Sequence, residues 1–116
     1  MYKKVFLIFF SLSIGSCNSD SEIRNLLNSK DKDSIIKGAR KAGIKRKKDF
    51  VPLLLYKAYD WRTSTNFNFK GVSVFQAKME ALEKIYKVKP PSSITDIPDS
   101  TIIKFYTEIY NKDSKK

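Results

Sequence analysis

Apolar residues recur at spacings of three and four in five segments of the chain, which is the spacing of one face of an α-helix. The pattern predicts a short helix around residues 23–27 and longer helices over 34–42, 50–59, 74–88 and 101–110. Residues 65–69 alternate apolar and polar side chains, as a short extended segment does, but no partner strand is evident. We therefore expect an all-α domain of about five helices.

Residues that favour helix ends stand beside most of these segments. Polar side chains at the expected starts can accept hydrogen bonds from free backbone N–H groups, and two pairs have the spacing of a capping box. The candidates are Ser19 with Glu22, Asp31 or Asp33, Asp49, Ser73 with Gln76, and Asp99 or Ser100. At the other ends, Gly43 follows the second helix and Pro90-Pro91 follows the fourth.

The segment from Phe50 to Tyr59 is apolar on nearly every side. Pro52 falls in its first turn, where the missing N–H would have no helical partner in any case. A helix that is apolar nearly all round is covered on several sides in a folded domain. We therefore expect this helix to be the central one, with Leu54 at the middle of the core.

The first residues of the chain have the organisation of a secretory signal. Lys3 and Lys4 precede an apolar run from Val5 to Ser13, and small residues follow it. The run is shorter than a membrane-spanning helix requires. We expect export and removal of this segment; the alternatives are an uncleaved hydrophobic N-terminus and a soluble secreted protein with one spare thiol.

The next four residues, Ile14, Gly15, Ser16 and Cys17, resemble the lipobox of bacterial lipoproteins. The resemblance implies that the Cys17 sulfur receives a diacylglycerol, with palmitate as a typical acyl chain, and that Cys17 becomes the mature N-terminus. It also implies a lipid-anchored location in the bacterial cell envelope, at the periplasmic face or the cell surface. The expected organisation is a signal peptide over 1–16, an acylated cysteine and short tether over 17–20, a helical domain over 21–111 and a charged tail over 112–116.

The charge of the chain is strongly basic, with 23 Lys and Arg against 12 Asp and Glu and a formal net charge of +11. Loss of Lys3 and Lys4 with the signal lowers this charge to +9. A basic domain often binds nucleic acid, but an exported one meets anionic lipid head groups or acidic proteins instead. We expect no nucleic-acid partner; a lysine-rich solvated surface without any specific partner would have the same composition.

The chain has few side chains of the kinds that act in catalysis or bind metal ions. The chain has no histidine and one cysteine, which excludes the usual zinc sets and the Cys-His and Ser-His nucleophilic arrangements. Glu80 and Glu83 lie three apart beside Lys84, which is typical of a solvated helix face rather than of two carboxylates facing each other across a cleft. Asp96 and Asp99, on either side of Pro98, are no better placed. We expect a protein that is not an enzyme, without cofactor or metal.

Two segments resemble HEAT repeats, in which an acidic turn, a basic residue, paired alanines and a glycine precede a leucine-rich second helix. Residues 33–43 with 50–55 are similar to one such unit, and residues 72–85 are similar to the first helix of a following unit. Two helix pairs are fewer than a stacked solenoid needs. The resemblance therefore implies a compact domain with HEAT-like antiparallel helix pairs, and a binding scaffold as its role.

Residues 60–71 interrupt the helical pattern and form the longest irregular segment. They place the only Trp, two Phe and two cations among small polar residues, a mixture that is enriched at binding hot spots. The candidate partner-binding residues are Trp61, Arg62, Phe67, Phe69 and Lys70. The alternative is that the aromatic side chains fold back as a lid over the helix ends, with Asp60 and Arg62 bonding locally.

Two functions follow from these features. The first is a membrane-anchored, non-enzymatic interaction module that binds another envelope protein, either as an immunity-type inhibitor of a toxin or as an accessory subunit. The second is a structural envelope protein whose basic face rests on anionic lipid. The sequence does not name the partner.

Overall fold

The computed structural model describes residues 19–115. The signal segment, the lipobox and Cys17 lie outside the described residues. The chain is helical over residues 19–27, and the elements that follow are α2 (Lys32–Lys45), the 3₁₀ helix η1 (Lys48–Phe50), α3 (Val51–Leu55), the 3₁₀ helix η2 (Phe67–Phe69), α4 (Val74–Tyr86) and α5 (Ser100–Ser114). Over 19–115 the only β-type pairing is one isolated bridge, so the expected all-α fold is confirmed. Within the same residues, no helix has the length and apolar character needed to cross a membrane.

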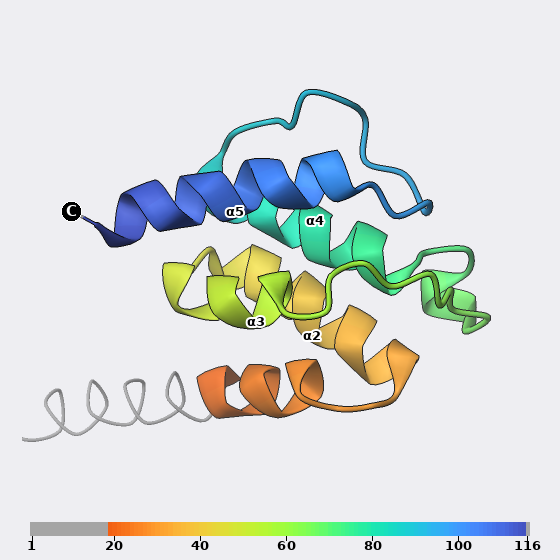
Figure 1. The fold of residues 1–116 in the computed structure, drawn as a ribbon. Helices are drawn as coiled ribbons and strands as arrows, with labels where there is room; N and C mark the ends of the chain where they lie inside the picture. The colour runs from red at the N-terminus through yellow and green to blue at the C-terminus, as the bar shows by residue number, and fades with distance from the viewer. Residues whose placement is uncertain (1–18, 116) are drawn as a thin grey trace, which may run out of the picture.

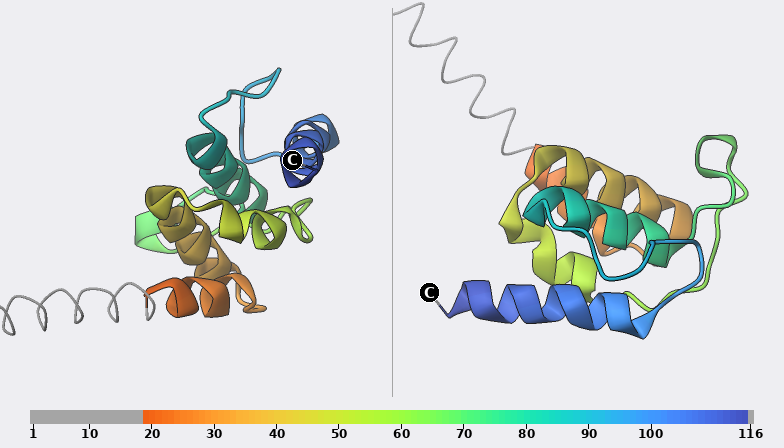
Figure 2. Two further views of the ribbon diagram at one scale, coloured as in Figure 1. Left: turned by 90° about the vertical axis from the view of Figure 1, so that its left-hand side faces the viewer. Right: turned by 90° about the horizontal axis from the view of Figure 1, so that it is seen from above.

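Helix α4 is the centre of the fold. It packs against α2, α3 and α5, while the 19–27 helix and α5 lie on opposite sides of the molecule (Figures 1 and 2). The expectation that the 50–59 helix would be central is wrong. Helix α3 is only five residues long, because Lys57 takes a left-handed conformation with φ of 47° and Tyr56 leaves the helix with 62% of its surface exposed.

The capping signals locate most helix starts correctly. Asp31 accepts a hydrogen bond from the Ser34 N–H at 3.0 Å, and Ser73 accepts one from the Gln76 N–H at 3.0 Å. Asp99, rather than Ser100, caps α5. Asp49 caps nothing, because it lies within η1 and α3 begins without a side-chain cap.

Two glycines of α2 allow close contact with the helices on either side. A Cβ on Gly38 would lie 2.8 Å from Leu26 Cβ, and one on Gly43 would lie 3.1 Å from Ala81 Cα. The position of Gly43 predicted the end of this helix, but Gly43 lies within it. The helix continues to Lys45 and ends at Arg46, which has a φ of 55°.

Ion pairs attach the 19–27 helix to the rest of the domain. Asp20 pairs with Lys45 at 3.2 Å and with Lys47 at 2.5 Å, and Glu22 pairs with Lys41 at 2.7 Å. The hydrogen bond from Lys47 is the main reason that the pKa of Asp20 lies below its usual value. Asp20, expected to belong to a tether, is thus part of the folded domain.

Candidate interaction surface

Residues 60–75 form a hairpin-like structure rather than an irregular loop. The Ser64 N–H donates to Val72 O at 2.9 Å, the Val74 N–H donates to Arg62 O at 3.0 Å, and Thr63 forms an antiparallel bridge with Ser73. The extended segment expected at residues 65–69 is not found there, because residues 67–69 form η2; the extended pairing lies at Thr63, and its partner is the stretch leading into α4. Gly71 closes the turn at a φ of 81°, a conformation that glycine adopts without steric cost.

Arg62 and Asp60 hold the base of this hairpin. Arg62 donates to the Asp60 carboxylate through Nη2 at 2.7 Å and Nε at 3.0 Å, and its Nη1 donates to Lys30 O at 2.7 Å. Burial alone would raise the pKa of Asp60, but the hydrogen bonds from Arg62 outweigh it and leave that pKa below its usual value. The pair fastens the hairpin to the turn after the 19–27 helix, so Arg62 has a structural role.

The tip of the hairpin carries an almost fully exposed aromatic residue. Asn66 caps η2 by accepting a hydrogen bond from the Asn68 N–H at 3.0 Å, and Phe67 at the start of η2 is 94% exposed. Phe69, two residues further on, packs against the core, with the Arg40 guanidinium 5.0 Å from its ring centroid. Lys70 is exposed beside it.

A second pair of aromatic residues is exposed where the hairpin begins. Tyr59 and Trp61 meet edge to face with ring centroids 6.2 Å apart, and Trp61 is 59% exposed. Successive side chains of extended backbone point to opposite faces, so Asp60 and Arg62 bond toward the domain while Tyr59 and Trp61 face solvent. The five residues singled out from the sequence thus divide: Trp61, Arg62, Phe67 and Lys70 are exposed, although Arg62 also fastens the hairpin, whereas Phe69 packs on the core.

The hairpin tip and the first described residues lie at opposite ends of the molecule. In Figure 1 the 19–27 helix starts on the left and the η2 tip lies at the far right, and the second panel of Figure 2 shows the same separation. The exposed aromatic side chain of Phe67 is therefore remote from residue 19.

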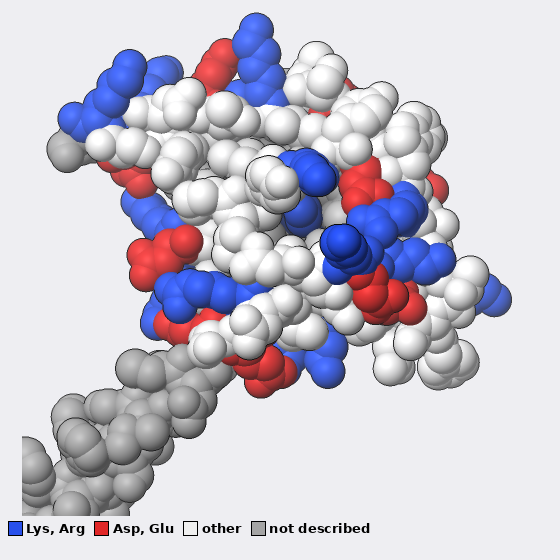
Figure 3. Space-filling view, turned by 60° about the horizontal axis from the view of Figure 1, so that its bottom comes forward, with Lys and Arg blue, Asp and Glu red and all other residues white. Residues whose placement is uncertain are grey.

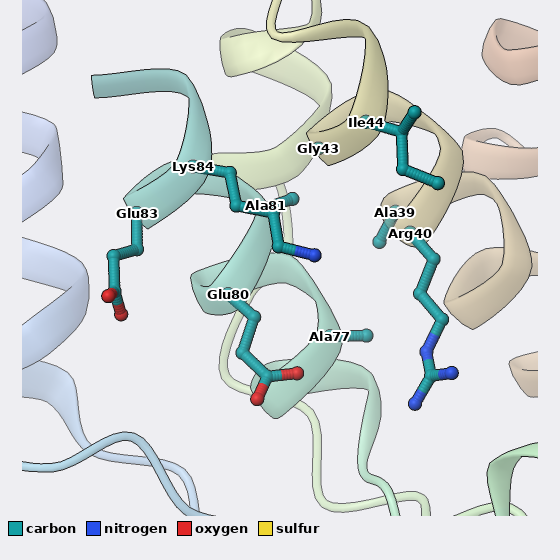
Figure 4. Close-up of a pocket in the computed structure, with 9 residues that line it drawn as sticks. All are labelled: Ala39, Arg40, Gly43, Ile44, Ala77, Glu80, Ala81, Glu83 and Lys84. Carbon is teal, nitrogen blue, oxygen red and sulfur yellow. The ribbon is translucent and has the colours of Figure 1, made fainter. Parts of the chain in front are cut away.

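A groove of about 470 Å³ runs between α2 and α4 (Figure 4). Its floor consists of the small residues Ala39, Gly43, Ala77 and Ala81, and Arg40, Glu80 and Lys84 stand around it. Glu80 and Glu83 point in different directions (Figure 4), so the two carboxylates do not face a common point. The arrangement fits the solvated helix face expected from the sequence.

A pocket of about 410 Å³ lies where the hairpin base meets the ends of two helices. Lys78 of α4 lines it and donates from Nζ to Tyr56 O, the carbonyl that follows α3, at 2.7 Å. Only 3% of Lys78 is exposed. Burial lowers the pKa of its ammonium to about 8, although the neighbouring Asp60 carboxylate opposes that effect.

Sequence reasoning missed this buried lysine. Lys78 lies three residues after Phe75 and four before Leu82, so it stands on the apolar face of α4. That position indicates a buried lysine, because a lysine on an apolar helix face needs a polar partner within the fold.

The charge pattern does not form a single basic face in the view of Figure 3. Lys and Arg side chains alternate there with Asp and Glu side chains. Within residues 19–115, no three His, Cys, Asp or Glu side chains gather in a way that could hold a metal ion.

Comparisons of the chain with protein-family models, with curated proteins and with solved structures give no match. The similarity to HEAT repeats and to the lipobox therefore stays a prediction from the sequence. In the structure, α2 packs mainly against α4.

Proposed function

We propose that this chain is a membrane-anchored envelope lipoprotein that acts as a non-enzymatic protein-interaction module, with the hairpin of residues 60–75 as its binding element. The observation that carries the proposal is Phe67, a large aromatic side chain left 94% exposed at a tip whose backbone is fixed by hydrogen bonds. Large aromatic residues are common anchors at protein interfaces. A hairpin that is already ordered loses little conformational entropy when a partner binds.

The position of the tip favours a protein partner over a lipid surface. An acyl chain on Cys17 would be two residues from residue 19, at the end of the molecule opposite the tip (Figure 1). The hairpin tip would then lie at the end of the domain away from the anchor (Figure 1). The alternative, a structural protein whose basic face binds anionic lipid, requires a face of one sign, and the face drawn in Figure 3 is of mixed sign.

The lipid anchor can be tested separately from binding. We expect the Cys17→Ala variant to accumulate as an unprocessed precursor without metabolic fatty-acid labelling, because the sulfur that accepts the lipid is gone. A Ser13→Ala variant, altered in the apolar run before the cysteine, should be processed and labelled normally. Equal labelling of the wild type and the Cys17 variant would refute the anchor.

The binding element can be tested by affinity capture from the native membranes followed by mass spectrometry. We expect Phe67→Ala and Trp61→Ala each to weaken capture of the partner, since removing a hot-spot aromatic residue typically costs 2 kcal/mol or more, about a 30-fold loss of affinity. Their melting temperatures should stay close to that of the wild type, because both side chains are exposed.

Phe69→Ala is the matched control for these two variants. Phe69 packs against the core and under Arg40, so its loss should lower the melting temperature. Unchanged capture by both the Phe67 and the Trp61 variants, at unchanged stability, would reject the hairpin as the binding element. Salt-sensitive binding of the unacylated protein to anionic liposomes would favour the structural alternative.

A further inference from the structure

The pocket beside Lys78 is built from five parts of the chain. It is lined by the end of the 19–27 helix and the turn after it, by α2, by the residues that follow α3, by the hairpin base and by α4. The charged residues that line it are Lys30, Lys57, Asp60, Arg62 and Lys78. Four cations thus surround one carboxylate.

That single carboxylate is already neutralised. Both oxygens of Asp60 accept hydrogen bonds from Arg62, whose remaining contact is with Lys30 O. Within residues 19–115, Lys30, Lys57 and Lys78 form no ion pair with a carboxylate. The pocket therefore keeps an excess of positive charge.

Lys78 also keeps unused hydrogen-bond capacity. An ammonium group has three N–H donors, and among the described residues its only acceptor is Tyr56 O. A buried charge is stable only when it is paired and hydrogen-bonded. An anion in the pocket would supply the missing acceptors and the missing charge.

The surroundings favour an anion of one charge over a dianion. The 19–27 helix and α3 both end at this pocket, and helix C-termini carry partial negative charge. Lys78 binds the carbonyl of Tyr56 and Arg62 binds that of Lys30, so these carbonyls are partly compensated. A carboxylate with one negative charge fits this balance, whereas a phosphate dianion would meet stronger repulsion from the carbonyls and from Asp60.

We propose that this pocket receives a side-chain carboxylate from an acidic segment of the partner protein, with Lys78 and Lys57 as its ligands. The inference rests on the proposed function, since it names the chemistry of the partner. Tyr56 at the pocket is 62% exposed, and the pocket adjoins the hairpin base, so one partner can contact the hairpin and fill the pocket together. The excess positive charge of the chain favours an acidic partner.

The test uses the mature acylated protein, from Cys17 to Lys116, in detergent and a fluorescent hexaglutamate peptide with blocked termini, so that only side-chain carboxylates are offered. Anisotropy titrations compare the wild type with Lys78→Met and with the control Lys84→Met, an exposed lysine of the same helix. We expect Lys78→Met to weaken peptide binding at least tenfold and Lys84→Met to change it less than twofold. Equal losses in the two variants would overturn the proposal, because they would indicate general attraction to a basic surface.

Competition experiments identify the source of the carboxylate. At equal ionic strength, we expect millimolar acetate and inorganic phosphate to displace little of the peptide. Displacement by acetate at that concentration would overturn the proposal in favour of a small free carboxylate, and stronger displacement by phosphate would overturn the preference for a single charge.

A second pair of variants tests the pocket independently, in case Lys78→Met does not fold. Lys57 and Lys87 are both exposed and both left-handed, with φ of 47° and 58°, but only Lys57 lines the pocket. Lys57→Gln should weaken hexaglutamate binding several-fold, and Lys87→Gln should leave it unchanged. If both variants bind the peptide as the wild type does, the pocket proposal is wrong; the proposed function fails separately, when the Phe67 and Trp61 variants capture the partner normally.

Discussion

Replacement of Leu54 by alanine is expected to lower the free energy of unfolding by about 2 to 5 kcal/mol, the range for removing a fully buried leucine side chain. Leu54 has no exposed surface and lies on α3, which packs against both α4 and α5. The cavity left by the side chain would therefore open between three helices. Urea denaturation of residues 18–116, followed by circular dichroism, measures the loss.

Leu55→Ala is the control, because Leu55 is the next residue of α3 but only half-buried. We expect it to cost clearly less than Leu54→Ala. A loss below about 1 kcal/mol for Leu54→Ala, or equal losses for the two variants, would mean that the short α3 does not close the core as the contacts indicate.

The sequence predicted the positions of helices better than their roles. Asp31, Ser73 and Asp99 cap three helices as expected, because capping depends on a side chain and on N–H groups two or three residues away. The length of α3 depends instead on the backbone of Lys57, which adopts a positive φ. The composition of the 50–59 segment does not indicate a positive φ at Lys57. Its apolar residues therefore predicted a longer, central helix.

The hairpin could be predicted only in part. The alternation at residues 65–69 predicted an extended segment there, but residues 67–69 form η2 and the paired segment lies around Thr63. Its partner, the stretch leading into α4, was not evident, because one isolated bridge leaves no alternating pattern of its own. The sequence therefore left open whether the aromatic residues formed a lid or a binding loop. In the structure, Phe69 packs on the core as in a lid, and Phe67 does not.

Lys78 gives the second large effect that we expect, a rise in stability at alkaline pH. Burial holds its pKa at about 8 in the folded protein, against 10.5 for an ordinary lysine. Between these values the unfolded chain binds more protons than the folded one, so the free energy of unfolding increases with pH. At about 1.4 kcal/mol for each unit of pKa, the gain between pH 7 and pH 10 is about 2 to 3 kcal/mol. Burial also raises the pKa of Tyr106, which acts in the opposite direction at still higher pH, where the unfolded chain loses its tyrosine proton first.

The measurement is a series of urea denaturations from pH 7 to pH 10 at constant ionic strength. In the Lys78→Met variant the rise should be absent, because no buried ammonium remains to lose its proton. The Lys84→Met variant should keep the rise, since Lys84 is exposed on the same helix. A wild-type stability that is flat or falling between pH 8 and pH 10 would contradict the prediction. It would mean that contacts with Tyr56 O and the nearby Asp60 carboxylate stabilise the ammonium as well as water does.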